Sequence, residues 1–293
     1  MFLKLLFFIL IFASLGVSDT LQEPMPVIVS VGWLKTHLND KDVIVIDVRK
    51  NKDYRKRHIK GAVNMPVMKD FFTKKTLKMP KLTYLKELFS NAGIDTNTKV
   101  IVYDNGQFCW AARVCWVLKV LGHKNESLLR YGYGDYIKSN LPISKKSPKK
   151  IRTEFILRVN DEMIATKLDV LIAIQNKEPI LDGRSRDMYM GKTSIAKRYG
   201  HIPTAQLFSG ANNYKITADG NKLKSFDELK SIYKSMPKNK KIIIYCQDGA
   251  DAALDDILMR KLGYKTSVYE GSWIEWGNDD ALPIVNPSKK SKI

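Results

Sequence analysis

One thiol of this sequence has the surroundings of a reactive group. Cys246 follows the apolar residues 242–245, and a segment of helical periodicity begins at Ala252. We expect a buried strand, a tight loop and a helix, which turn the thiol toward the helix N-terminus. Unpaired backbone N–H groups and the helix dipole would lower the pKa of the thiol there and make it a nucleophile. We call the residues of this turn the Cys246 loop: Cys246, Gln247, Asp248, Gly249, Ala250 and Asp251.

Two kinds of reaction use a thiolate in such a loop. In phosphoryl transfer, as in cysteine phosphatases and arsenate reductases, an Arg at the end of the loop clamps the oxyanion. Here that position is Ala252, and the sequence has no Arg or Lys from Cys246 through Leu258. In sulfur transfer, the thiolate holds a sulfane sulfur as a persulfide, which backbone N–H groups stabilise. The sequence therefore favours sulfur transfer.

The elements that position this loop occur twice. Compared with itself at a shift of roughly 140 residues, the chain shows ordered matches typical of a duplicated domain. The matched segments are 43–49 with 179–184, 58–62 with 201–205, and 99–104 with 241–246. Apolar runs rich in Val and Ile alternate with helical segments in each half, which predicts a mainly parallel sheet with helices on both faces. Ligands of such sheets bind beyond the carboxyl ends of the strands, where Cys246 lies.

These motifs together resemble a tandem-domain rhodanese, of the family of thiosulfate and 3-mercaptopyruvate sulfurtransferases. The resemblance extends from residue 27 to 287, and its motifs are 45–49 with 58–64, 181–184 with 200–203, 102–105 with 111–114, and 269–276. It implies that Cys246 carries the persulfide and that the first half is a catalytically silent copy. The sequence agrees, because Asp104 stands at the position equivalent to Cys246, and a carboxylate cannot hold a sulfane sulfur.

The chain departs from the family pattern at two places. The Cys246 loop carries Asp248 and Asp251. Either these acids only stabilise the first turn of the helix, or they raise the pKa of the thiol and repel a dianionic donor such as thiosulfate. The family also commonly places an Arg where this sequence has Met188. The remaining candidates for substrate binding are Arg184 and Arg186, and Lys192, Lys197 or Arg198 are further sources of positive charge.

The ends of the domains are marked by composition. Lys4 precedes the apolar residues 5–12 and a stretch of small residues, which predicts a secretory signal peptide over residues 1–18. We expect an exported, periplasmic protein with no integral membrane span after signal removal, and an uncleaved anchor is the alternative. The first domain is expected at 27–144, a solvated linker at 145–154 and the second domain at 155–287. The basic linker lacks interleaved aromatic residues, so we expect no nucleic-acid partner.

The remaining conspicuous residues are interpreted as structural. His58 and His201 occupy matching positions of a silent and an active half, which favours fold-building hydrogen bonds over base catalysis. Trp273 and Trp276, like the thiols of Cys109 and Cys115, are expected to pack. An odd count of three cysteines excludes a complete disulfide framework, and no Cys/His cluster has zinc-ligand spacing. The formal net charge of +19 is interpreted as a diffuse basic surface.

The sequence thus predicts an enzyme that moves sulfur through Cys246. The expected donor is a small sulfane-sulfur compound such as thiosulfate, mercaptopyruvate or polysulfide, and the expected acceptor is a thiol, cyanide or a thioredoxin-like protein. We expect neither a metal nor an organic cofactor. The alternative is a rhodanese scaffold without turnover, which binds persulfide or carries it for a partner protein.

Overall fold

Each half of the chain forms a five-stranded parallel sheet, in a computed structural model that describes residues 25–217 and 220–289. The predicted signal peptide therefore lies outside the described residues. The first sheet has the order β1 (Ile28–Val29), β6 (Glu126–Leu129), β5 (Lys99–Tyr103), β2 (Val43–Asp47) and β4 (Val63–Asn64). The second has the order β8 (Ile164–Ala165), β14 (Lys265–Tyr269), β13 (Lys241–Tyr245), β9 (Ile180–Asp182) and β10 (Gln206–Leu207). The two orders correspond strand for strand, which confirms the predicted α/β fold with tandem domains.

Helices cover both sheets and connect their parallel strands. In the first half they are α1 (Val31–His37), α2 (Asn51–Lys56), α3 (Val67–Asp70), α4 (Leu82–Asn91), α5 (Cys109–Val120) and α6 (Tyr133–Lys138). In the second half they are α7 (Lys167–Gln175), α8 (Arg186–Tyr189), α9 (Phe226–Tyr233), α10 (Ala250–Lys261) and α11 (Ser272–Trp276). Both α7 and α9 begin with a capping box, in which the side chains of the cap and the third helical residue bond each other's backbone N–H groups. No described helix is long and apolar enough to cross a bilayer.

Short elements complete the two halves. The strands β3 (His58–Ile59) and β7 (Ile143–Ser144) pair antiparallel, and β11 (Tyr214–Thr217) forms an antiparallel hairpin with β12 (Gly220–Leu223). Two turns of 3-10 helix cover Asp161–Met163 and Gly210–Asn213. The Asn221 side chain donates a hydrogen bond to Gly106 O at 2.9 Å, so the hairpin of the second half reaches the first.

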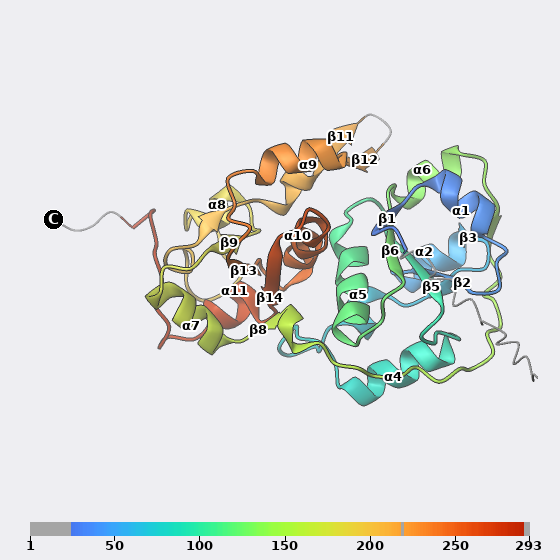
Figure 1. Ribbon diagram of the computed structural model, residues 1–293, viewed down its shortest axis with the longest axis horizontal. Helices are drawn as coiled ribbons and strands as arrows, with labels where there is room; N and C mark the ends of the chain where they lie inside the picture. Colours follow the sequence, from blue (N-terminus) through green and yellow to red (C-terminus); the bar gives the residue numbers. More distant parts are fainter. Residues whose placement is uncertain (1–24, 218–219, 290–293) are drawn as a thin grey trace, which may run out of the picture.

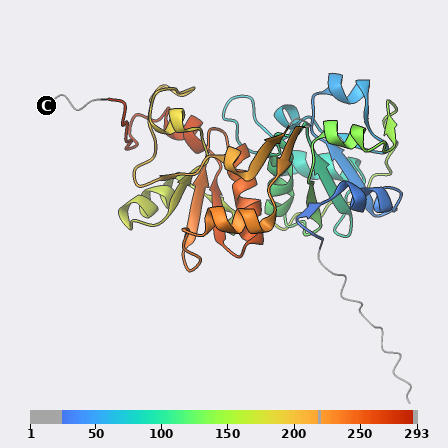
Figure 2. The ribbon, with the colours of Figure 1, turned by 90° about the horizontal axis from the view of Figure 1, so that it is seen from above.

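The two halves share an apolar interface built on equivalent helices. Figures 1 and 2 show them side by side, with α5 and α10 facing each other between the sheets. One continuous cluster of buried side chains includes Val114 and Leu118 of α5 together with Leu254 and Leu258 of α10. The helices that follow Asp104 and Cys246 are therefore packed against one another. The first half, which is expected to be catalytically silent and is called the silent half below, thus lies close to the Cys246 loop of the second, or active, half.

An Asp, an Arg and a Tyr form the same buried set of hydrogen bonds in both halves. In the second half, Arg184 Nη2 donates to Asp182 Oδ2 at 2.6 Å and to Gly200 O at 2.8 Å. Tyr245 OH, at the end of β13, donates to the same Asp182 oxygen at 2.5 Å. Asp47, Arg49 and Tyr103 make the same contacts in the first half, with Arg57 O in place of Gly200 O. These bonds join neighbouring strands at their carboxyl ends, which gives the two arginines a structural role.

The two histidines are held in equivalent hydrogen bonds. His201 Nδ1 lies 2.8 Å from Tyr189 O, and because a carbonyl oxygen only accepts, this nitrogen carries a proton. The His201 ring stacks on Tyr189 with centroids 3.8 Å apart, and burial lowers the pKa of His201. His58 and Tyr54 repeat the stack at 3.7 Å and the hydrogen bond at 2.8 Å. The expected fold-building role of both residues is confirmed.

The connection between the halves lies on the first half. Residues 145–160 contain no helix or strand. Thr153 Oγ1 donates to Ile94 O at 2.8 Å, and the Phe155 ring packs on Phe89 with centroids 5.1 Å apart. Residue 155, where we expected the second domain to begin, therefore still belongs to the packing of the first.

Candidate active site

The Cys246 loop lies at the carboxyl end of β13, the middle strand of its sheet. Cys246 Sγ accepts a hydrogen bond from the Gly249 N–H at 3.1 Å. Gly249 has φ +91°, in the left-handed region that favours glycine, so the chain curls around the sulfur. The helix begins at Ala250 rather than at Ala252, which places Ala250 and Asp251 in its first turn. Thiol, glycine and helix N-terminus thus meet as the sequence predicts.

A second segment, residues 269–276, closes over this loop. The Cys246 N–H donates to Ser272 Oγ at 3.2 Å, and the Trp273 N–H donates to Cys246 O at 3.0 Å. Gln247 O accepts from the Ile274 N–H at 3.0 Å, whereas its side-chain amide is buried without a partner among the described residues. Trp273 and Trp276 are fully buried, as their expected packing role requires.

Burial and two carboxylates disfavour the thiolate. Cys246 is fully buried, and burial, followed by the charges of Asp248 and Asp251, raises the pKa of its thiol. Asp248 Oδ1 lies 4.0 Å from Sγ. The N–H groups of Ala252 and Asp248 act in the opposite direction, as a helix N-terminus should, but their effect is smaller. The expectation of a lowered pKa is therefore wrong for this closed site, because desolvation outweighs the helix terminus.

Asp251 connects the loop to the silent half. Burial, followed by the charge of Asp248, raises the pKa of Asp251 to about 6, and a hydrogen bond from Cys109 opposes this shift. Cys109 is the first residue of α5, and burial raises the pKa of its thiol. Cys115, on the same helix, is also buried. Both thiols pack as expected, and Cys109 additionally contacts the active half.

A buried arginine of the silent half approaches the Cys246 loop. Arg113 of α5 is fully buried, and its Nη2 donates to Glu270 Oε1 at 2.5 Å. Its Nη1 has no partner among the described residues and lies 3.2 Å from the position that a Cβ on Gly249 would take. A guanidinium nitrogen of the other half thus lies beside the Cys246 loop, although the charge of Arg113 is paired with Glu270. Sequence reasoning missed this residue, although a lone Arg inside the apolar residues 109–118 was a usable signal.

The arginines proposed for substrate binding have different surroundings. Arg184 is 2% exposed and committed to Asp182, with only Nη1 left without a described partner. Arg186 lies on the exposed face of α8 and forms no ion pair with a described residue. Arg198 donates to the carbonyl oxygens of Leu282 and Trp276, both at 2.7 Å, which gives it a structural task.

A buried carboxyl group of α10 lies beside the thiol. Asp255 Oδ1 accepts from Asn213 Nδ2 at 2.5 Å and from Tyr233 OH at 3.0 Å, and Oδ2 has no described partner. A Cβ added to Gly183 would meet Asp255 Oδ2 at 3.0 Å and Cys246 Cβ at 3.4 Å. The free oxygen and the Cys246 side chain therefore face the same small space. Burial raises the pKa of Asp255 well above its usual range.

In the silent half a carboxylate fills the equivalent loop. Asp104 Oδ1 accepts from the Gly106 N–H at 2.7 Å, and Oδ2 accepts from the Ala111 N–H at 3.3 Å. Burial raises the pKa of Asp104, and backbone N–H groups of the loop lower it. The backbone N–H groups of this loop thus bind the Asp104 carboxylate, at the position where the second half has the sulfur of Cys246. No group of three or more His, Cys, Asp or Glu side chains among the described residues has the arrangement of a metal site.

Comparisons with known proteins agree with this duplicated architecture. The rhodanese-like domain family matches residues 30–139 and 166–279. The sulfur carrier protein TtuD of Thermus thermophilus is 30% identical over 278 residues, covering 88% of this chain and 96% of the relative. The 3-mercaptopyruvate sulfurtransferase of Escherichia coli strain K12 is 28% identical, covering 87% and 96%.

A solved structure shows the same likeness in three dimensions. SseA from Escherichia coli, described as having the rhodanese fold, superposes with a TM-score of 0.75 at 25% identity, covering 85% of this chain and 99% of SseA. Because the family matches most of the chain in two consecutive domains, the protein belongs to the rhodanese family, in its tandem-domain sulfurtransferase form.

Proposed function

We propose that this protein transfers a sulfane sulfur through a persulfide on Cys246. The observation that carries the proposal is the hydrogen bond from the Gly249 N–H to Cys246 Sγ at 3.1 Å, at the start of the 12-residue helix α10. The same N–H group and the helix terminus would stabilise the negative charge of a persulfide after transfer.

The reaction consists of two displacements. In the first, the Cys246 thiolate forms a bond to the sulfane sulfur of the donor, and the bond between that sulfur and the rest of the donor breaks with its electron pair on the leaving group. In the second, an acceptor thiolate or cyanide attacks the outer sulfur, and Cys246 leaves as a thiolate. No net oxidation occurs, and neither step needs a metal or an organic cofactor.

The acids beside the thiol suggest which donors suit the site. Asp248 and Asp251 both raise the pKa of Cys246, so a dianion such as thiosulfate meets negative charge on its way to the sulfur. We therefore expect mercaptopyruvate, a monoanion, and organic persulfides to be better donors than thiosulfate. Because Cys246 is fully buried, the covering segments must move before any donor reaches Sγ.

A donor panel tests the proposal. The wild-type protein is incubated with thiosulfate, mercaptopyruvate or polysulfide, and Cys246 is examined by peptide mass spectrometry for a gain of about 32 Da, the mass of one sulfur. Release of sulfide or thiocyanate in the presence of a thiol or cyanide measures turnover. We expect Cys246→Ser to abolish both signals and Cys115→Ser, which alters another buried thiol, to retain them. Absence of the mass gain with all three donors would overturn the proposal.

A carrier without turnover is the second candidate. It is favoured by the likeness to the sulfur carrier protein TtuD and by the raised pKa of the Cys246 thiol. A carrier would acquire the persulfide but would pass it only to a partner protein, such as a thioredoxin-like acceptor. Single-turnover labelling without multiple turnover on small acceptors would assign this function. We further propose export to the periplasm, and detection of the mature N-terminus after the signal segment would test it.

A further inference from the structure

The silent half contains a large cavity at the place that corresponds to the active site. It has a volume of about 830 Å³ and lies between the segment after β2 and the loop after β5. Such a volume is typical of cavities that bind small molecules. Its lining includes Asp104, the counterpart of Cys246, but the carboxylate of Asp104 already occupies the backbone N–H groups of its loop. A ligand therefore meets the side chains of the wall rather than the loop.

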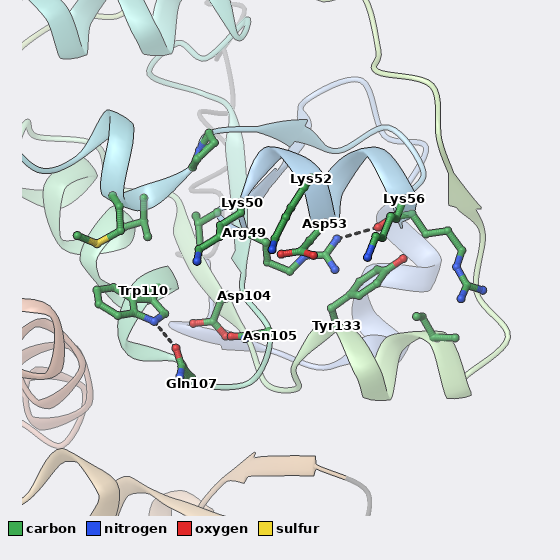
Figure 3. Close-up of a pocket in the computed structure, with 16 residues that line it drawn as sticks. Arg49, Lys50, Lys52, Asp53, Lys56, Asp104, Asn105, Gln107, Trp110 and Tyr133 are labelled. Atoms are coloured by element: carbon green, nitrogen blue, oxygen red, sulfur yellow. Dashed lines mark hydrogen bonds between the residues drawn. The ribbon is translucent and has the colours of Figure 1, made fainter.

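The wall is strongly basic. Lys50, Lys52, Lys56 and Arg57 line the cavity, are exposed, and form no ion pair with any described residue. Figure 3 shows Lys50 and Lys52 extending across the cavity toward the loop that holds Asp104. The acids of the lining are Asp53 and Asp104, and the charge of Arg49 is neutralised by Asp47 beneath it. The cavity thus has an excess of positive charge with no protein partner in the described part of the chain.

These lysines are not a remnant of the duplicated fold. Tyr54 and Tyr189 stack on equivalent histidines, and in the same register Lys50 and Lys52 correspond to Ser185 and Asp187 of the active half. Lys52 and Lys56 also stand four positions apart on α2, a spacing at which like charges destabilise a helix. Positive charges that only the first half carries at these positions indicate a separate use for them.

Aromatic residues form the other walls. Trp110 is half-buried, packs edge-on against Phe72, and lies on the opposite side of the cavity from Tyr133 (Figure 3). The guanidinium of Arg49 covers the Tyr133 ring, 3.6 Å from its centroid. The indole of Trp110 is therefore the aromatic surface of the lining that a flat ligand can contact. Pro66, Val67 and Met68 add apolar lining beside it.

We propose that this cavity is a binding site for a small organic polyanion that carries a flat ring, a class represented by nucleoside diphosphates. The lysines contact its negative groups, and Trp110 contacts its ring. A cavity of about 830 Å³ accommodates a small molecule, so we favour such a ligand over a protein or nucleic-acid surface. The proposal goes beyond sulfur transfer and does not depend on it, because the site lies in the half that lacks the reactive cysteine.

Titration calorimetry on the Cys246→Ser protein tests the site without sulfur chemistry. The probes are adenosine diphosphate and inorganic pyrophosphate, both without metal, at roughly physiological ionic strength. We expect saturable binding of adenosine diphosphate below about 1 mM, weakened roughly tenfold or more by the double substitution Lys52→Glu and Lys56→Glu. Trp110→Ala should weaken adenosine diphosphate but not pyrophosphate. Circular dichroism and thermal denaturation verify that each variant folds.

A matched control separates a built site from overall basicity. The double substitution Lys41→Glu and Lys124→Glu changes the net charge equally, at exposed positions near the amino ends of β2 and β6, the opposite edge of the same sheet. We expect it to change binding less than about threefold, as a distant and screened charge should. The proposal is overturned if neither probe binds, if both double variants lose affinity equally, or if single-stranded DNA binds as tightly as adenosine diphosphate. Equal loss of both probes in Trp110→Ala would refute the contact with the ring.

Discussion

Replacing Asp248 with Asn should make the Cys246 thiol more reactive. Asp248 Oδ1 lies 4.0 Å from Sγ, and at that distance two unit charges interact by about 4 kcal/mol at an effective dielectric constant of about 20 and by about 1 kcal/mol in water. Asp248 is half-buried, so the repulsion of the thiolate falls between these limits. At about 1.4 kcal/mol per pKa unit, Asp248→Asn should lower the pKa of Cys246 by about 1 to 3 units. Asn retains the oxygen that accepts from the Ala250 N–H at 3.2 Å, so the helix cap survives.

The rate of alkylation by iodoacetamide measures this change. Because the pKa of Cys246 is raised above its usual range, the rate near pH 8 is proportional to the small thiolate fraction. A thiolate also loses intrinsic nucleophilicity as its pKa falls, with a Brønsted coefficient of about 0.4 to 0.5. The net expectation is a rate roughly 3- to 50-fold higher than in the wild type. Peptide mapping confines the measurement to Cys246.

The control is Asp227→Asn, which removes the same charge from the exposed first turn of α9. It should change the rate less than about twofold, because solvent and salt screen exposed charges. If Asp248→Asn reacts no faster than this control, then Asp248 does not act on the thiol and its only role is to cap the helix.

Three further outcomes follow from buried groups. Arg113→Met removes one partner of a buried ion pair and should lower the free energy of unfolding by roughly 3 kcal/mol, which lowers Tm by about 6 to 12 °C. Adding Glu270→Gln should restore at least about 1 kcal/mol, as measured by thermal denaturation in a double-mutant cycle. Burial disfavours the charged form of Asp255, so the neutral and similarly shaped side chain in Asp255→Asn should leave stability in urea within about 1 kcal/mol of the wild type. Asp255→Ala leaves Asn213 without its acceptor and should cost about 1 to 3 kcal/mol. The pKa of Asp251 is raised to about 6, so between about pH 4 and 6 the folded protein holds a proton that the unfolded chain has lost. The resulting contribution to stability, on the order of 2 to 3 kcal/mol, is complete below about pH 4 and disappears as the pH rises through 6. Asp251→Asn should abolish this pH dependence in urea titrations.

Much of the site could be predicted because its signals are local. Residues that adjoin in the chain determine the strand before Cys246, the positive φ of Gly249 and the helix after it. The duplication adds a second local observation, because Asp104 stands at the position equivalent to Cys246. The contact between Arg184 and Asp182 is local in the same sense, since the carboxylate stands two positions away in the chain.

The surroundings of the thiol depend on residues that are distant in the chain. The contact between Arg113 and Glu270 spans 157 positions, and the hydrogen bond from Cys246 to Ser272 spans 26. No periodicity or propensity encodes such pairs, because only the packing of α5 against α10 brings them together. The beginning of the second domain was placed too early for a related reason, since Phe155 finds its apolar partner in the first half.

The sequence by itself predicted which residue is the nucleophile, which half is silent and that each half forms a mainly parallel sheet, because these predictions follow from repeated local patterns. Only the tertiary structure decided in which direction the pKa of Cys246 is shifted. A helix N-terminus favours a thiolate, but desolvation depends on how many atoms of both halves surround the sulfur, and here it dominates. The same holds for the silent half, where Asp104 marked a lost cysteine but only the fold revealed a basic cavity beside it.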